Sequence, residues 1–253
     1  MNKPAAGHAS STQDPEHDLM PDFVVLPREP HESARVWSYR VLLFNIVHLH
    51  LPPGSCLVES EVRQRLDVSR TPVREALMHL AQEKFVTIIP QKGTYVTRID
   101  MEQVLELRYI RSCVEARTAR EASIRMTPEL ADRFGQCLVL QRKAAKARDF
   151  EAFMNHDDAM HSLLYIAAGK PGVWTFFDKN NLHHYRSRIL GLRVGRTLAR
   201  LLSEHEVIVE ALLQRDADAA EQGVLCHLAA SVWNSDAVLE NFPDYIVPPK
   251  HNA

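Results

Sequence analysis

Residues 69–80 read SRTPVREALMHL, and this stretch decides the fold of the N-terminal part of the chain. It predicts a helix, because Ser69 or Thr71 can cap the first turn. Its apolar residues recur at helical spacing and predict one buried face: Val73, Ala76, Leu77 and Leu80. Arg70 and Arg74 lie four positions apart on the other side, where guanidinium and hydroxyl groups together are suited to contacting DNA. An amphipathic helix with two arginines is also common on protein surfaces, so the interpretation depends on its neighbours.

The segments before residue 69 predict a helix-turn-helix. Residues 33–48 predict a helix with one apolar face, and a Pro-Pro-Gly sequence ends it. Residues 60–66 predict a short second helix, and residues 67–68 form a tight turn into the next one. Two short helices joined in this way, with exposed arginine on the second, are typical of DNA-binding helix-turn-helix units.

After Gln82 the pattern changes from helix to strand. Residues 85–89 and 94–97 are rich in β-branched and aromatic side chains, and residues 90–93, Pro-Gln-Lys-Gly, separate them. This arrangement predicts a β-hairpin. The hairpin would be the wing of a winged helix-turn-helix.

Composition and charge limit the class of protein. The chain has 253 residues, of which 45% are hydrophobic and only 7% aromatic, which predicts a mainly helical protein with two cores. Its four cysteines are widely separated and no apolar run approaches a membrane span, so we expect a cytoplasmic protein without disulfides and without membrane contact. The net charge is −4 for residues 1–32, +4 for residues 33–98 and −2 for the rest. The basic excess therefore coincides with the predicted winged helix-turn-helix.

Three motifs resemble the DNA-binding domain of the GntR family of bacterial transcription regulators: Pro53-Gly54, residues 69–77 and Gly93-Thr94-Tyr95-Val96. The resemblance implies that Arg70 and Arg74 contact bases or phosphates and that Ser69 and Thr71 contact the DNA backbone. It also implies that the wing tip, Lys92-Gly93, lies close to the DNA, with Gly93 approaching the minor groove. One recognition helix contacts only a few base pairs, so we expect a homodimer on a pseudo-palindromic operator of double-stranded DNA.

The rest of the chain predicts an all-α bundle of six or seven antiparallel helices. Capping residues, prolines and glycines place these helices at about 102–124, from 127 onward, and at 149–168, 173–190, 197–214 and 216–233. The predicted division of the chain is a disordered tail at 1–32, a winged helix-turn-helix at 33–98, a linker at 99–102, a helical sensing domain at 103–240 and an irregular tail at 241–253.

Four side chains in the helical region could hold one metal ion. Asp157 and His161 lie four positions apart, so both side chains leave the same helix face. His205 and His227 lie on two later helices, each on a side shared with apolar residues. One carboxylate with three imidazoles suits Zn²⁺, and also Ni²⁺, Fe²⁺ or Mn²⁺. A single helical histidine is more often an ordinary surface or core residue.

The same positions resemble the helical sensor domain, FCD, of the FadR group within the GntR family. They occur here as Asp157-x-x-x-His161, Glu204-His205 and His227-Leu228. The resemblance implies a divalent cation, zinc first, beside an organic-acid pocket. Arg111 lies in a sequence similar to the group's Arg-x-x-Leu-Glu motif and is expected to bind a carboxylate ligand, although an ion pair with Glu115 fits the spacing equally well.

Another pair of histidines, His183 and His184, could supply a further ligand or a partner of one. Their neighbours Tyr185 and Arg186 predict a partly exposed polar face. We therefore leave both histidines outside the predicted metal site.

Together these patterns favour a ligand-responsive repressor of transcription that senses a small carboxylate at a divalent metal. One alternative is a metal-dependent hydrolase or oxygenase that uses the Asp/His cluster. It is disfavoured because no further carboxylate is clearly spaced to act as a general base. Another alternative is a structural DNA-binding protein in which the cluster is fortuitous.

Overall fold

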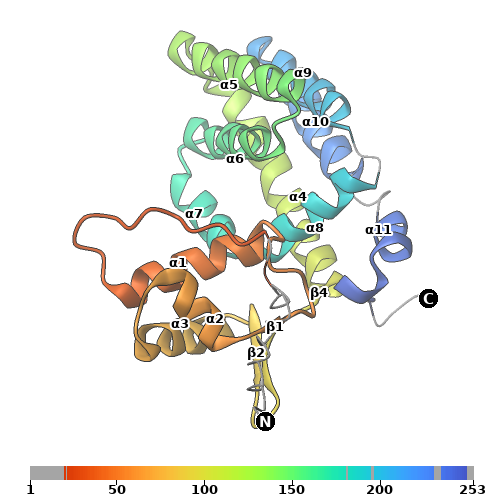
Figure 1. The fold of residues 1–253 in the computed structure, drawn as a ribbon. Helices are drawn as coiled ribbons and strands as arrows, with labels where there is room; N and C mark the ends of the chain where they lie inside the picture. The colour runs from red at the N-terminus through yellow and green to blue at the C-terminus, as the bar shows by residue number, and fades with distance from the viewer. Residues whose placement is uncertain (1–19, 21, 181, 195–196, 231–234, 250–253) are drawn as a thin grey trace, which may run out of the picture.

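A computed structural model gives the fold for residues 20, 22–180, 182–194, 197–230 and 235–249. The protein is mainly helical, with an N-terminal winged helix-turn-helix and a larger helical domain, as the sequence predicts (Figure 1). Within the described ranges, no helix is long and apolar enough to cross a membrane.

The winged helix-turn-helix has its elements in the predicted order. They are α1 (Ala34–Val47), β1 (Cys56–Leu57), α2 (Glu59–Leu66), α3 (Arg70–Gln82), β2 (Val86–Ile89) and β3 (Gly93–Val96). The apolar face of α3 is buried in a core shared with α1, which confirms the predicted helix face. β2 and β3 pair antiparallel, with Val86 opposite Val96 and Ile89 opposite Gly93, which confirms the hairpin. β1 was not predicted, and it adds a third strand on the other side of β3.

The segment before α1 is packed against that helix, whereas the sequence predicted a disordered tail through residue 32. Phe23 is buried in the core under α1, and the indole nitrogen of Trp37 donates to the carbonyl of Leu26 at 2.9 Å. The buried side chain of Asn45 accepts from the amide of Val24 at 2.7 Å and donates to its carbonyl at 2.8 Å. The prediction is therefore wrong for residues 22–32, because a few anchoring contacts hold a segment whose overall composition is polar. Residues 1–19 and 21 lie outside the described residues.

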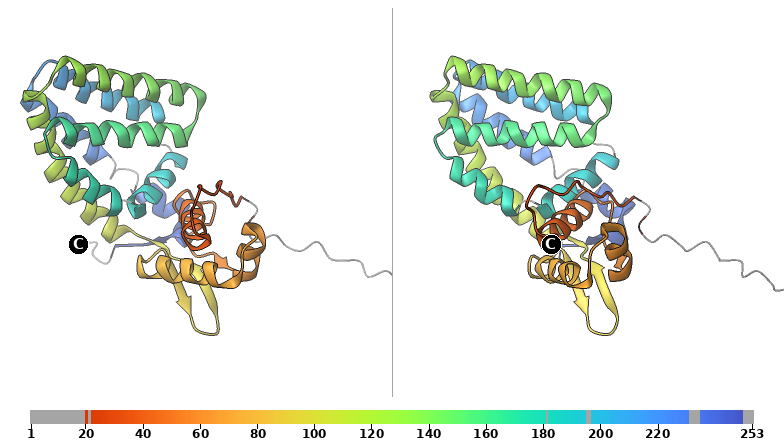
Figure 2. Two further views of the ribbon diagram at one scale, coloured as in Figure 1. Left: turned by 90° about the vertical axis from the view of Figure 1, so that its left-hand side faces the viewer. Right: turned by 60° about the vertical axis from the view of Figure 1, so that its left-hand side comes forward.

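The helical domain follows the predicted caps and breaks. Its first helices are α4 (Met101–Ile124), α5 (Pro128–Ala147), α6 (Phe150–Ala167), α7 (Pro171–Asn180), α8 (Leu182–Arg193), α9 (Leu198–Leu213) and α10 (Ala217–Ala230). Thr127 and Asp149 cap α5 and α6, because their side chains accept from backbone amides of the first turn at 3.3 and 2.9 Å. α5 lies beside α6 and α9, and α4 packs along α6, α9 and α10 (Figure 2). The segment predicted as one helix at 173–190 is described as two, α7 and α8, on either side of residue 181.

A short parallel pairing joins the predicted linker to the predicted C-terminal tail. β4 (Ile99–Asp100) pairs with β5 (Ile246–Val247), and Ile99 and Ile246 are both buried. A helix α11 (Ser235–Asn241) and a 3₁₀ turn at Pro243–Tyr245 precede β5. The expectation of an unstructured linker is therefore corrected, and so is that of an irregular tail for residues 241–249, whereas residues 250–253 lie outside the described residues. Two-residue strands far apart in the sequence carry no local period that a sequence pattern could reveal.

Candidate DNA-binding surface and metal centre

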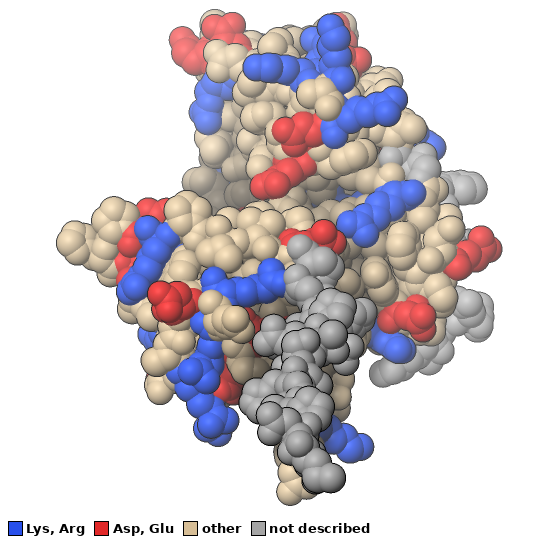
Figure 3. Space-filling model, viewed as in Figure 1, with Lys and Arg blue, Asp and Glu red and all other residues tan. Residues whose placement is uncertain are grey.

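The start of α3 is exposed, as DNA contact requires. Ser69, Arg70, Thr71 and Arg74 all lie on the surface, and Lys and Arg side chains gather over the region of α2 and α3 (Figure 3). Ser69 occupies the N-cap position, but its hydroxyl accepts no hydrogen bond from an amide of the helix, so the predicted cap through that hydroxyl is not formed. The Ser69 hydroxyl is therefore available to another acceptor or donor.

The two arginines of α3 differ in their surroundings. Arg70 forms an ion pair with Glu59 of α2, with Nε 2.7 Å from Oε1. Arg74 lies one turn further along the exposed face. To contact DNA, the guanidinium of Arg70 would have to break its ion pair with Glu59 or bind DNA and Glu59 at the same time. Arg74 is therefore the more readily available of the two.

The wing tip joins β2 to β3 and extends away from the body of the molecule (Figure 1). Lys92 is exposed there, and the carbonyl of Lys92 accepts from the hydroxyl of Tyr95 at 3.2 Å. Gly93 has φ of +136°, a conformation that side-chain-bearing residues rarely adopt. The glycine therefore permits the tight reversal that presents Lys92 at the tip.

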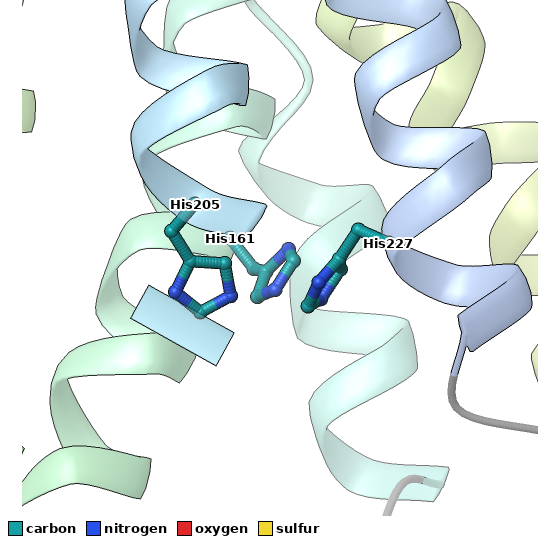
Figure 4. Close-up of side chains that lie close together, drawn as sticks. All are labelled: His161, His205 and His227. Atoms are coloured by element: carbon teal, nitrogen blue, oxygen red, sulfur yellow. The ribbon is translucent and has the colours of Figure 1, made fainter. Parts of the chain in front are cut away.

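The helical domain brings together three histidines that are far apart in the sequence. His161 of α6, His205 of α9 and His227 of α10 point toward one another (Figure 4), and one ligand nitrogen from each lies within 4.8 Å of the others. All three are buried. Asp157 of α6 is buried beside them, with Oδ1 3.3 Å from Nε2 of His205 and Oδ2 3.7 Å from Nε2 of His161. The four side chains that the sequence singled out thus form one cluster.

Several polar atoms in this cluster have no hydrogen-bond partner among the described residues. Among them are Oδ1 of Asp157, Nε2 of His161 and Nε2 of His205. Leaving buried polar atoms unpaired is costly, and a divalent cation ligated by them would remove that cost. The donor set of imidazole and carboxylate therefore fits a divalent transition metal.

A second layer of side chains orients the imidazoles. Nδ1 of His161 faces the carboxylate of Glu115, Nδ1 of His205 lies 2.7 Å from Oε1 of Gln141, and Nδ1 of His227 lies 2.9 Å from Oε2 of Glu204. With Nδ1 held in this way, Nε2 of His161 and Nε2 of His205 are the atoms that face a cation, which is the usual arrangement around metal-bound histidine. Sequence reasoning assigned none of these three partners. Glu115 and Glu204 stand in the motifs quoted above without a role toward histidine, and Gln141 carries no signal beyond a polar residue that packing buries.

The charges of the cluster also suit a cation. Although burial opposes ionisation, the guanidinium of Arg188 holds the pKa of the Asp157 carboxyl well below its ordinary value. Burial likewise opposes ionisation of Glu115, and Arg111 and His161 reverse that effect and lower its pKa. Burial lowers the pKa of His205, so this imidazole is neutral at pH 7. Anionic carboxylates and neutral imidazoles are the protonation states that metal ligation needs.

Arg111 lies next to this cluster but is already paired. It is buried on α4, and its Nε lies 2.8 Å from Oε2 of Glu115, which is the ion pair that the spacing allowed. The hydroxyl of Tyr165 donates to the same oxygen at 3.3 Å. Through Glu115, Arg111 is linked to His161.

The face of α8 that carries His184 and Arg186 is buried, which corrects the prediction of a partly exposed polar face. His184 is 5% exposed and Arg186 is 0% exposed. α8 contacts α1, α4 and β4, so it lies between the winged helix-turn-helix and the bundle. A polar sequence was therefore buried by the packing of two domains, which local sequence does not report.

Acidification from pH 6.5 toward 4 should destabilise the zinc-free protein. Burial lowers the pKa of His183 to about 4, and burial also lowers the pKa of His184. Above pH 6.5 these imidazoles are neutral in the folded and the unfolded chain. Below pH 6.5 the histidines of the unfolded chain bind protons, whereas the buried histidines of the folded chain stay neutral. The free energy of unfolding therefore falls, by about 3 kcal/mol for His183 alone at pH 4.

Urea unfolding with a chelator present, at pH 7.5, 6 and 5, measures this loss. Carboxylates with lowered pKa lose their contribution mainly below this window, so they interfere little. His183→Phe retains a ring beside Phe85, against which His183 stacks at 4.5 Å, and should flatten the pH dependence. If the free energy of unfolding of this variant depended on pH as that of the wild type does, His183 would not be a source of the loss.

Comparisons with known proteins identify the family. The family model described as bacterial regulatory proteins, gntR family, matches residues 39–96, and the FCD domain model matches residues 106–230. The HTH-type transcriptional repressor RspR of Escherichia coli (strain K12) is 36% identical over 199 residues, which cover 79% of this chain and 87% of that protein. The chain belongs to the GntR family. Its members are DNA-binding transcriptional regulators, which confirms a regulator over the metal-dependent enzyme considered above.

Further comparisons place this GntR-family chain beside other regulators. The gluconate operon transcriptional repressor of Bacillus subtilis (strain 168) is 26% identical over 183 residues, covering 69% of this chain and 74% of that protein. Among solved structures, E. coli McbR/YncC has a TM-score of 0.66 at 18% identity, covering 83% of this chain and 99% of that one. A GntR regulator from Rhodococcus sp. RHA1 has a TM-score of 0.63 at 22% identity, with the same coverage. At these identities the structural likeness supports the fold alone.

Proposed function

We propose that this GntR-family regulator is a ligand-responsive repressor whose helical domain binds a divalent cation together with a small carboxylate. The observation that carries the proposal is the convergence of unpaired, buried donor atoms from Asp157, His161 and His205 beside His227. The names of the relatives RspR and the gluconate operon repressor support repression as the direction of control.

The cation that fits this donor set best is Zn²⁺, with Ni²⁺, Mn²⁺ and Fe²⁺ as other candidates. Asp157, His161, His205 and His227 would hold it, and Glu115, Gln141 and Glu204 would orient the imidazoles. A bound divalent cation supplies a positive charge that attracts a carboxylate ligand.

Arg111 is the proposed second anchor for that carboxylate. Its Nε and Nη2 face Glu115, at 2.8 and 3.5 Å, so Nη1 is the donor that we assign to the ligand. Charge-assisted hydrogen bonds from arginine to carboxylates are strong and directional. Arg111 would therefore serve the ligand and Glu115 at the same time.

On the DNA side, we propose a homodimer that binds a pseudo-palindromic operator. Arg74 and Arg70 would contact bases or phosphates in the major groove, Ser69 and Thr71 the sugar-phosphate backbone, and Lys92 and Gly93 the DNA beside the wing. The exposure of α3 and of the wing tip supports this assignment.

Metal analysis and operator binding test the proposal. Plasma mass spectrometry of protein purified without a metal-affinity step should find close to one divalent ion per chain, and mass spectrometry of the denatured protein should identify a co-purified carboxylate. An operator selected from random DNA should be released when that carboxylate is added to the metal-loaded protein. Metal-free protein that still responds to the carboxylate would contradict the proposed site.

Replacing Lys92 by alanine should weaken binding to operator and unrelated DNA equally. A lysine at the wing tip neutralises phosphate charge and carries little base information. The slope of log affinity against log salt should therefore fall by about 1. Fluorescence anisotropy at several salt concentrations gives this slope, and Lys146→Ala, an exposed lysine of α5, is the matched control. A loss confined to the operator sequence would contradict a phosphate contact.

A further inference from the structure

Helix α8 contacts the Asp/His cluster on one side and the base of the wing on the other. Two neighbouring arginines make these contacts, Arg188 toward Asp157 and Arg186 toward Thr97. Residues two positions apart on a helix point to nearly opposite sides. One rigid helix therefore touches both the candidate cation site and the DNA-binding domain.

The contact on the wing side is made by a buried, uncompensated charge. Nη2 of Arg186 donates to the carbonyl of Thr97 at 2.7 Å, while Nε and Nη1 have no hydrogen-bond partner among the described residues. Burial lowers the pKa of this guanidinium to about 10, and no carboxylate in the described part of the chain opposes the effect. Because this carbonyl is the one hydrogen-bond partner of the buried guanidinium among the described residues, breaking the contact is costly, so the position of Arg186 and that of Thr97 depend on each other.

Thr97 lies where the wing is closed at its base. Its amide donates to the carbonyl of Phe85 at 3.0 Å, and its hydroxyl donates to the carbonyl of Lys84 at 2.7 Å. The ring of His183, also on α8, stacks on Phe85 with the centroids 4.5 Å apart. A shift of α8 therefore acts on both strands of the hairpin where they leave the domain.

The contact on the cluster side shares a carboxylate with the proposed cation. Arg188 pairs with Oδ2 of Asp157 and with Oδ1 of Asp158, the latter at 2.9 Å. Oδ1 of Asp157 has no hydrogen-bond partner among the described residues and faces His205. A divalent cation bound at that oxygen would offset the negative charge that holds Arg188, because both cations then act on one carboxylate.

We propose that α8 transmits the state of the cation site to the wing, with Arg188 as the positioning residue at Asp157 and Arg186 as the positioning residue at Thr97. This rests on the proposed function, since it takes the Asp/His cluster as the sensor. Cation binding weakens the hold of Asp157 on Arg188, α8 shifts, and the contact of Arg186 with Thr97 changes. The cation can drive this shift only by its differential affinity for the two positions of α8.

The test uses the full chain, stripped of metal, and zinc chloride alone as the probe. Zinc affinity is measured by competition with a chromogenic chelator, and hydrogen exchange of residues 93–98 reports on the base of the wing. The variants are Arg186→Met, Arg186→Lys and Arg188→Met, and Arg117→Met, an arginine of α4 whose side chain is 66% exposed, is the matched control.

In the wild type and in Arg117→Met, zinc should change the exchange of residues 93–98. Arg186→Met should still bind zinc, because Arg186 contacts Thr97 and not the candidate ligands, yet show no zinc-dependent change in that segment. It should also melt no lower than the wild type, since replacing an uncompensated buried charge by an apolar residue is often neutral or stabilising. Arg186→Lys keeps the charge without the planar guanidinium and should lose most of the response. Arg188→Met, without zinc, should shift the exchange in the direction that zinc produces in the wild type.

A normal zinc response of the wing in both Arg186 variants overturns the proposal. So does a wild type that binds zinc without any change at residues 93–98, an outcome that leaves the cation site intact. A wild type that fails to compete with the chelator refutes the proposed function itself. In that case Arg188→Met still decides the coupling through α8, and unchanged exchange at the wing in this zinc-free variant refutes it.

Discussion

Replacing both His205 and His227 by alanine is expected to abolish metal binding and the response to the effector while leaving operator binding in place. The two imidazoles come from α9 and α10, so their removal leaves only the two candidate ligands of α6, Asp157 and His161. A pair of ligands from a single helix cannot enclose a cation as three helices can. The winged helix-turn-helix, whose core lies under α1 and α3, keeps its DNA-binding surface.

The loss should be visible in thermal stability. A cation at 100 times its dissociation constant stabilises the folded state by about 2.7 kcal/mol, which raises the melting temperature of a chain of this size by roughly 5–10 °C. The wild type should show this shift on addition of zinc, and the double variant should show none. Calorimetry with and without zinc, together with chelator competition, measures both effects.

His156→Ala is the matched control, because His156 lies on α6 next to Asp157 but outside the cluster. Loss of His205 also removes the partner of Oε1 of the buried Gln141, so the alanine variant is expected to melt lower even without metal. His205→Gln restores a polar side chain there and separates the two effects. A double variant that keeps a full metal complement and a normal effector response would show that the cluster is ordinary bundle packing.

Replacing Arg74 by alanine should cost about 1–3 kcal/mol of operator affinity, roughly 5- to 150-fold, and relax the base preference at one position in each half-site. Arg74 lies on the exposed face of α3, where a guanidinium can bind O6 and N7 of one guanine. The effect should exceed that of Arg70→Ala, because Arg70 is already paired with Glu59 and gains less on binding DNA.

Competition binding with a library of single-base operator variants measures both affinity and preference. Arg133→Ala, an exposed arginine of α5, controls for the loss of one positive charge. Equal losses for operator and random DNA would reassign Arg74 to a phosphate contact. Unchanged affinity for both would mean that α3 is not the recognition helix.

Much of the fold follows from local sequence. The apolar spacing within residues 69–80 is enough to predict α3 and its buried face, and Thr127 and Asp149 mark the starts of α5 and α6 through their own side chains. These signals are readable because a helix is built from hydrogen bonds and side-chain contacts between residues at most four positions apart. The relation of Asp157 to His161 is of the same kind.

Other elements depend on contacts between distant parts of the chain. Residues 22–32 are ordered by α1, and β4 by β5, although neither segment has a helical or strand period of its own. The burial of Arg186 and His184 likewise results from the position of α8 between the two domains. A sequence pattern predicted a polar, partly exposed face there, because the pattern reports composition and not what packs against it.

For the candidate site, the sequence by itself determined the types of ligand and the pairing of Asp157 with His161 on one helix face. Only the tertiary structure decided that His205 and His227 meet this pair, and that Glu115, Gln141 and Glu204 each hold one nitrogen of an imidazole. The physical reason is that helix periodicity fixes the direction of a side chain within its own helix. The distance between side chains on different helices is set by how the helices pack, and packing is a property of the whole core.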